Sequence, residues 1–131
     1  MSEWVLEASV ILAYLQDEPG SEIAEESLLE GEVGSVNCSE FARRLSVSGL
    51  SDEELRSLLA SLGIYVVDFD DNRALRAGLM QRETRSIGLS LGDRACLTLA
   101  AGLKATALTA DSSWLRLDPG VQVRSIRPEK P

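Results

Sequence analysis

The feature that most constrains the fold is a repeated alternation of short apolar segments with longer amphipathic ones. The short segments have the length and composition of buried strands, and the longer ones carry apolar residues at helical spacing. This alternation predicts an α/β fold, a three-layer α/β/α sandwich around a mostly parallel sheet of about five short strands. The expected strands are residues 4–6, 32–36, 64–67, 105–108 and 121–126.

Residues with strong capping preferences mark where the expected helices begin and end. The expected N-caps are Ser21, Asn37, Ser51 and Ser90, and the expected helix ends are Gly31, Gly49, Gly63 and Gly102. Polar alternation in the last strand favours a position at a sheet edge. The 131 residues contain no internal repeat and no linker, so we expect a single domain over 1–131 with a disordered tail at 127–131.

The absence of histidine limits the chemistry available to this chain. It removes histidine general bases, Ser-His and Cys-His nucleophiles and ordinary zinc sites. Cys38 and Cys96 lie in expected amphipathic helices, which favours buried thiols over a disulfide or a metal pair. No apolar run approaches a membrane span, and no basic leader precedes the first strand, so we expect a cytoplasmic protein without membrane association.

The net charge of −8 is unevenly distributed along the chain. The first 42 residues contain ten acidic and no basic residues, whereas the remainder contains eleven acidic and thirteen basic ones. An acidic chain argues against broad electrostatic binding of nucleic acid but leaves room for a local basic rim. The N-terminal third favours a basic protein partner.

Four carboxylates lie where expected strands end or expected helices begin: Glu7, Glu40, Asp93 and Asp111. Each has a local explanation, since Asn37 with Glu40 and Ser90 with Asp93 fit capping pairs, Asp111 fits a cap, and Glu7 fits an exposed strand end. Together they fit one site at an edge of the sheet. A cluster of like charges favours a bound cation, and carboxylates without histidine or thiolate suit Mg²⁺ or Mn²⁺.

Such ions activate water and stabilise displacement at phosphorus. The helix N-termini are expected to keep Glu40 and Asp93 ionised. The hydroxyls of Ser9 and Thr109 lie beside two of the acids and fit either a supporting role for ligands and waters or local turn hydrogen bonds.

Four segments resemble the motifs of PIN-domain proteins of the VapC toxin type, in order and at family-like spacing over nearly the whole chain. The third and fourth segments together are the most specific. The segments are Val5–Leu15 with Glu18–Gly20, Ser35–Glu40, Leu89–Leu97 and Leu108–Trp114. The resemblance implies a Mg²⁺- or Mn²⁺-dependent endoribonuclease, the toxin of a toxin–antitoxin pair, with a cognate VapB-like antitoxin and a homodimeric toxin.

The resemblance also implies that Glu40, Asp93 and Asp111 are acidic metal ligands and catalytic residues. Glu7 stands where the family normally has aspartate. Its extra methylene moves the carboxylate by about one bond length, and a misplacement of about 1 Å can cost ~10²-fold in rate. Glu7 therefore fits a working variant ligand, an attenuated site or an engineered change.

Two charged surfaces have both functional and structural interpretations. Acidic residues at Glu18, Glu22, Glu25 and Glu26 fit attraction of basic antitoxin residues or a solvated helix face. Arginines between residues 73 and 94 fit either a rim that binds RNA phosphates or ordinary i,i+4 charges on a helix surface. The candidates for RNA binding are Arg82, Arg85 and Arg94.

Two other functions compete with the nuclease. A phosphoacceptor receiver domain is also α/β, and Asp68 and Thr109 follow expected strands, but the chain lacks the acidic pair after the first strand and the late lysine that it needs. The other is a PIN fold retained for binding only, with its chemistry attenuated at Glu7.

Overall fold

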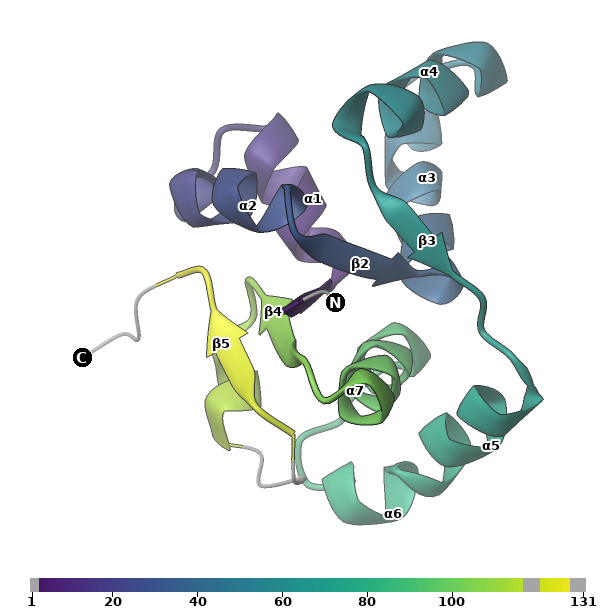
Figure 1. Cartoon of the computed structure of the whole chain (residues 1–131), viewed down its shortest axis with the longest axis vertical. Coiled ribbons are helices and arrows are strands. Elements are labelled where there is room, and N and C mark those ends of the chain that lie inside the picture. The colour runs from purple at the N-terminus through teal and green to yellow at the C-terminus, as the bar shows by residue number, and fades with distance from the viewer. Residues whose placement is uncertain (1–2, 117–120, 128–131) are drawn as a thin grey trace.

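A computed structural model describes residues 3–116 and 121–127, and the expected sheet forms its centre. Five parallel strands lie in the order β3-β2-β1-β4-β5, so the predicted fold class is confirmed (Figure 1). β5 lies at an edge, as its polar alternation predicted. The strands are β1 (Trp4–Leu6), β2 (Gly31–Gly34), β3 (Tyr65–Val67), β4 (Thr106–Thr109) and β5 (Val123–Ser125).

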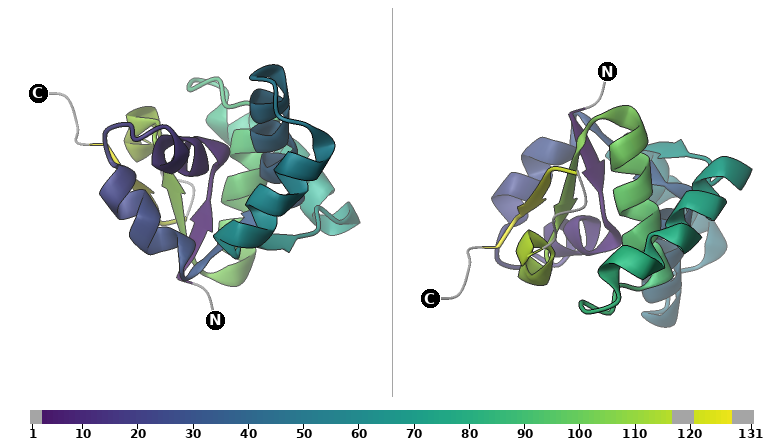
Figure 2. Two further views of the ribbon diagram at one scale, coloured as in Figure 1. Left: turned by 90° about the horizontal axis from the view of Figure 1, so that it is seen from above. Right: turned by 90° about the horizontal axis from the view of Figure 1, so that it is seen from below.

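Helices cover both faces of the sheet. Figures 1 and 2 show α1 and α2 on one side and α7 on the other, and α3 contacts both α1 and α7. The helices are α1 (Ala8–Leu15), α2 (Ser21–Leu28), α3 (Ser35–Val47), α4 (Asp52–Leu62), α5 (Asp71–Leu79), α6 (Gln81–Thr84) and α7 (Leu91–Leu103), with a 3-10 helix η1 (Ser112–Arg116). None of the helices described is both long and apolar enough to cross a membrane.

The alternation of side chains along the strands divides the core into two clusters. Leu6 and Leu108 face α1, α2 and α3, whereas Val5 and Ala107 face α7 and the buried Trp114. Burying one large apolar side chain contributes about 1.5–3 kcal/mol. The central strands are therefore fixed from both faces, and their ends provide a rigid edge.

The strand order creates a topological switch point between β1 and β4. The chain leaves β1 for β2 on one side and later returns to β4 on the other, with Leu6 paired to Leu108. In open parallel sheets, sites form outside the carboxyl ends of the strands at such a point. Glu7 follows β1 directly and is therefore placed there.

The start of α3 differs from the prediction. The segment Ser35–Val36, expected as strand, is helical, and Gly34 rather than Asn37 is the N-cap. Asn37 is the third helical residue and is fully buried, because its side chain has partners in other elements. Glu40 consequently lies in the second turn, not the first.

Three other helix boundaries also differ, and one is the end of α2, which lies at Leu28, whereas Gly31 begins β2. Gly20 is the N-cap of α2, and Ser21 is its first helical residue. Gly20 has φ of 95°, and a Cβ there would lie 2.5 Å from the Ile126 carbonyl oxygen, so tertiary packing selects glycine. α7 continues past Gly102 and ends with Lys104 as its C-cap.

The predicted caps of α4 and α7 are confirmed: Ser51 and Ser90 both form capping boxes, and Gly63 ends α4 in the left-handed conformation. Of the tail expected to be disordered, Arg127 is described and donates a hydrogen bond to Glu18 at 3.3 Å. Residues 128–131 lie outside the described residues.

Candidate functional site

Glu7 lies at the carboxyl end of β1 and is the N-cap of α1. Its carboxylate accepts hydrogen bonds from the backbone N–H of Ser9, at 2.6 Å, and from the Ser9 hydroxyl. The same hydroxyl oxygen accepts from the backbone N–H of Ala110 at 3.0 Å, just beyond β4. Ser9 therefore joins Glu7 to the neighbouring strand exit.

Asp93 lies in the first turn of α7, where the sequence predicted it. Its Oδ2 accepts from the backbone N–H of Ser90 at 3.1 Å, and its own N–H donates to the Ser90 hydroxyl at 3.1 Å. The capping interpretation is thus correct for this residue. Capping uses the Oδ2 atom of Asp93, and in the described contacts the Oδ1 atom remains available to another ligand.

Glu40 reaches from α3 to the N-terminus of α7. A Cβ built on Gly92 would lie 2.6 Å from the Glu40 carboxyl carbon, so the carboxylate fills the space beside the Gly92 backbone. Gly92 immediately precedes Asp93. The two acids, far apart in sequence, therefore meet at one helix end.

Glu7, Glu40 and Asp93 also interact electrostatically, which indicates that they lie near one another. Burial raises the pKa of Glu7, its hydrogen bonds to Ser9 oppose the shift, and the charges of Asp93 and Glu40 raise the pKa further. Burial and then the Asp93 charge raise the pKa of Glu40, against a lowering effect of Arg43 and Arg44. We call Glu7, Glu40 and Asp93 the acidic triad.

Glu40 was expected in the first turn of its own helix, where the helix N-terminus favours the ionised carboxylate, but it lies beyond that turn. Glu40 lies in the second turn of α3 and is partly buried, so desolvation dominates and its pKa moves upward. Cys96 lies in α7, and its thiol is buried. Burial raises the pKa of this thiol well above its usual value, and all three triad charges add to the effect.

Asp111 shares the sheet edge but has local partners. It is exposed, its Oδ1 accepts from the Ser113 N–H at 2.9 Å, and its own N–H donates to the hydroxyl of the buried Thr109 at 3.0 Å. Its charge is not among those that raise the pKa of Glu7 or Glu40. The side-chain contact described for Asp111 is therefore local, and Thr109 supports its turn.

The triad fits a hard divalent cation by donor type, since its side chains offer only carboxylate oxygens. Within residues 3–116 and 121–127, no three His, Cys, Asp or Glu side chains lie close enough together to hold an ion. Mg²⁺ commonly keeps several waters and binds through one or two carboxylates. The arrangement therefore fits an ion with water ligands rather than a closed protein cage.

Asn37 is the residue of this region that sequence reasoning assigned wrongly. Its Oδ1 accepts from the backbone N–H of Ala8 at 3.2 Å, and its Nδ2 donates to the carbonyl of Gly92 at 3.1 Å. The sequence offered only its position three residues before Glu40, which also fits a capping pair.

The candidate arginines divide into two kinds. Arg82 and Arg85 are exposed at α6, where they are free to meet a ligand. Arg94 is partly buried and donates from Nη1 to the Ala77 carbonyl of α5 at 3.0 Å. Arg94 therefore ties α5 to α7 and differs from the other two candidates.

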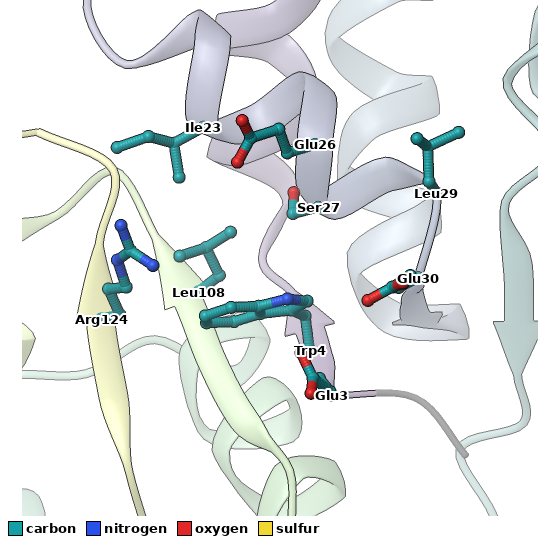
Figure 3. Close-up of a pocket in the computed structure, with 9 residues that line it drawn as sticks. All are labelled: Glu3, Trp4, Ile23, Glu26, Ser27, Leu29, Glu30, Leu108 and Arg124. Carbon is teal, nitrogen blue, oxygen red and sulfur yellow. The ribbon is translucent and has the colours of Figure 1, made fainter.

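A separate cavity of about 330 Å³ lies between α2 and the strands (Figure 3). Trp4 forms part of its floor, and the Arg124 guanidinium lies 5.6 Å from the Trp4 ring centroid, within cation–π range. Glu3, Glu26 and Glu30 also line it. Since Trp4 begins β1, this cavity lies towards the amino ends of the strands, away from the triad.

Solved structures with the same fold include several toxin–antitoxin complexes. The chain is similar to DNA-bound VapBC from Salmonella typhimurium (TM-score 0.74, 16% identity, covering 96% of this chain and 99% of that one). It is also similar to VapBC2 from Rickettsia felis bound to a promoter fragment (0.73, 16%, 93% and 97%) and to FitAcB from Neisseria gonorrhoeae (0.65, 20%, 92% and 95%). These likenesses establish the fold.

A search of curated protein sequences gives no match. The family model for the PIN domain matches residues 4–119, which include all four candidate acids. The predicted family is therefore confirmed, and the chain belongs to the PIN domain family.

Proposed function

We propose that this chain is a Mg²⁺- or Mn²⁺-dependent endoribonuclease, a VapC-like toxin that hydrolyses RNA phosphodiester bonds and is inhibited by a cognate antitoxin. The observation that supports this most directly is the convergence of Glu7, Glu40 and Asp93 at the switch point of a PIN fold. Their mutual repulsion makes a cation favourable there.

One or two carboxylates of the triad would bind the ion directly, with water as its other ligands, and Asp111 would add acidic charge from the β4 exit. Such an ion supplies activated water and neutralises charge on a phosphate group. Ser9 fixes the direction of the Glu7 carboxylate, and the capping box fixes Asp93. Thr109 holds the turn that carries Asp111.

RNA is the proposed substrate, and Arg82 and Arg85 are the groups proposed to contact its phosphates. An overall charge of −8 disfavours broad adhesion to RNA, so binding depends on a small basic rim near the site. The carbonyl contact of Arg94 gives it a structural role first.

The deciding experiment measures cleavage of single-stranded RNA with Mn²⁺ by the parent, by Glu7→Asp and by Asp93→Asn. Asp93→Asn removes a charged ligand and is expected to lower cleavage by about 10²-fold or more. Calorimetric titration with Mn²⁺ on the same proteins separates lost metal binding from misfolding. Equal cleavage by Asp93→Asn and the parent would contradict the metal-site proposal.

A second candidate, a PIN domain attenuated in catalysis and acting by binding, is favoured by one contact. Glu7 turns one carboxylate oxygen back to the Ser9 N–H and hydroxyl, where it caps its own helix. Cleavage by Glu7→Asp alone would support this candidate, whereas cleavage by the parent at a similar rate would oppose it.

The proposed protein partner is a VapB-like antitoxin with basic residues. Glu22, Glu25 and Glu26 are exposed on α2, and Glu26 also lines the cavity that contains Trp4. An arginine or lysine side chain fits this mixture of indole and carboxylates. Glu18 is already paired with Arg127 and contributes less to such a surface. A homodimeric toxin is proposed as well, and light scattering measures its mass.

A further inference from the structure

We propose that Asn37 is a positioning residue that sets the relative placement of the three triad carboxylates. This inference rests on the proposed metal-dependent function of the triad. Asn37 is fully buried in α3, and each end of its amide bonds to a different element. The side-chain oxygen accepts a hydrogen bond from the Ala8 N–H at the start of α1, and the amide nitrogen donates one to the Gly92 carbonyl in α7.

The two bonded backbones are those that carry the other acids. Ala8 directly follows Glu7, and Gly92 directly precedes Asp93. Asn37 itself lies three residues before Glu40, about one helical turn away. One buried amide therefore joins the segments that bear all three carboxylates, across sequence separations of 29 and 55 residues.

An amide is well suited to this task because it both donates and accepts at fixed geometry. Aspartate in its ionised form only accepts, and leucine of similar size does neither. Without the amide, the Ala8 N–H and the Gly92 carbonyl lose these partners in a buried region, so the helix N-termini are free to shift relative to α3. Residues that orient metal ligands in this way typically change metal affinity by about 10–100-fold.

The test compares Asn37→Leu and Asn37→Ala with the parent and with Ser27→Ala. Leucine keeps the volume, and alanine avoids any steric conflict, so a shared effect reports the lost hydrogen bonds. Ser27 is also buried, and its hydroxyl donates to the Ala24 carbonyl within α2, a helix that carries no residue of the triad. Its variant controls for the loss of a buried polar group elsewhere.

Two readouts are taken below the unfolding temperature of every variant. Calorimetry gives the Mn²⁺ dissociation constant, and amide hydrogen exchange of the metal-free protein follows Ala8, Asp93 and Arg94. Both Asn37 variants are expected to bind Mn²⁺ about tenfold or more weakly and to exchange faster at these amides. Ser27→Ala is expected to match the parent in both readouts.

Mn²⁺ affinity within twofold of the parent in both Asn37 variants would overturn the proposal, even if exchange were faster. Unchanged exchange would overturn it as well. If the parent itself bound no Mn²⁺ and cleaved no RNA, the proposed function would fail. Exchange would then still decide whether Asn37 holds α1 and α7 in place.

Discussion

The carboxylate of Glu40 occupies the space that a side chain at position 92 would fill. A Cβ on Gly92 would lie 2.6 Å from the Glu40 carboxyl carbon, although the two residues lie 52 positions apart in the sequence. The neighbouring atoms belong to the end of a flexible side chain, so a larger residue at 92 displaces the carboxylate rather than the backbone. The absence of a side chain at Gly92 therefore leaves the space that the Glu40 carboxylate occupies in the site.

Gly92→Ala is predicted to separate stability from site function. Alanine favours a helix over glycine by about 0.5–1 kcal/mol, so the melting temperature should stay level or rise. The displaced Glu40 carboxylate should weaken Mn²⁺ binding on the order of tenfold, as measured by calorimetry. Gly102→Ala is the matched control, because it lies in the same helix with no atom within 4 Å of the new Cβ. Equal Mn²⁺ affinity in the two variants would contradict this role for position 92.

Glu7→Gln is predicted to change how stability depends on pH. The pKa of Glu7 in the folded protein lies above its usual 4.5, so the folded state holds this proton more tightly than the unfolded state. As pH rises from about 4.5 through the folded-state pKa, the parent therefore loses free energy of unfolding at this residue. Glutamine removes this loss, so the free energy of unfolding of Glu7→Gln minus that of the parent should be larger at pH 7 than at pH 4.

Chemical denaturation at several pH values measures this difference. Glu53→Gln, at an exposed position of α4, is the control and should give a curve parallel to that of the parent. Parallel curves for Glu7→Gln would contradict the prediction. Added Mn²⁺ should stabilise the parent more at pH 7 than it stabilises Glu7→Gln, because the cation offsets the buried charge.

Arg82→Gln with Arg85→Gln is predicted to weaken RNA cleavage without affecting folding. Both side chains are exposed, so their loss should leave the melting temperature nearly unchanged. If each contacts one phosphate, the slope of log affinity against log salt should fall by about 0.7 per arginine. Arg56→Gln, exposed on α4, is the control for charge alone. Arg94→Gln should instead lower the melting temperature, since it loses the bond to Ala77.

Glu22→Lys with Glu26→Lys is predicted to slow association with the antitoxin. The exposed carboxylates of α2 attract a basic partner over distance, so reversing them should lower the association rate several-fold and reduce its salt dependence. Stopped-flow tryptophan fluorescence offers a signal, because Trp4 lines the adjacent cavity. Glu53→Lys, exposed on α4, is the comparison for reversing a charge away from this surface. Association that responds little to salt in the parent would count against this surface.

The sequence by itself determined the α/β alternation, the parallel sheet and the family. Local signals were sufficient there, because strand length, helical periodicity and capping side chains act over a few residues. Ser51 and Ser90 illustrate this, since their partners Glu54 and Asp93 lie three residues away and both capping boxes form as expected. The candidate acids Glu7, Glu40 and Asp93 were also identifiable by their places after strands and in helices.

Only the tertiary structure decided which acids meet and what holds them. Asn37 looked like a local cap, yet it is buried because Ala8 and Gly92 supply its partners from distant elements. That packing starts α3 earlier and moves Glu40 into the second turn, where burial and the Asp93 charge raise the pKa of its carboxyl. Contacts across 29 and 55 residues depend on how helices pack on the sheet, and no pattern within a short window of sequence encodes them.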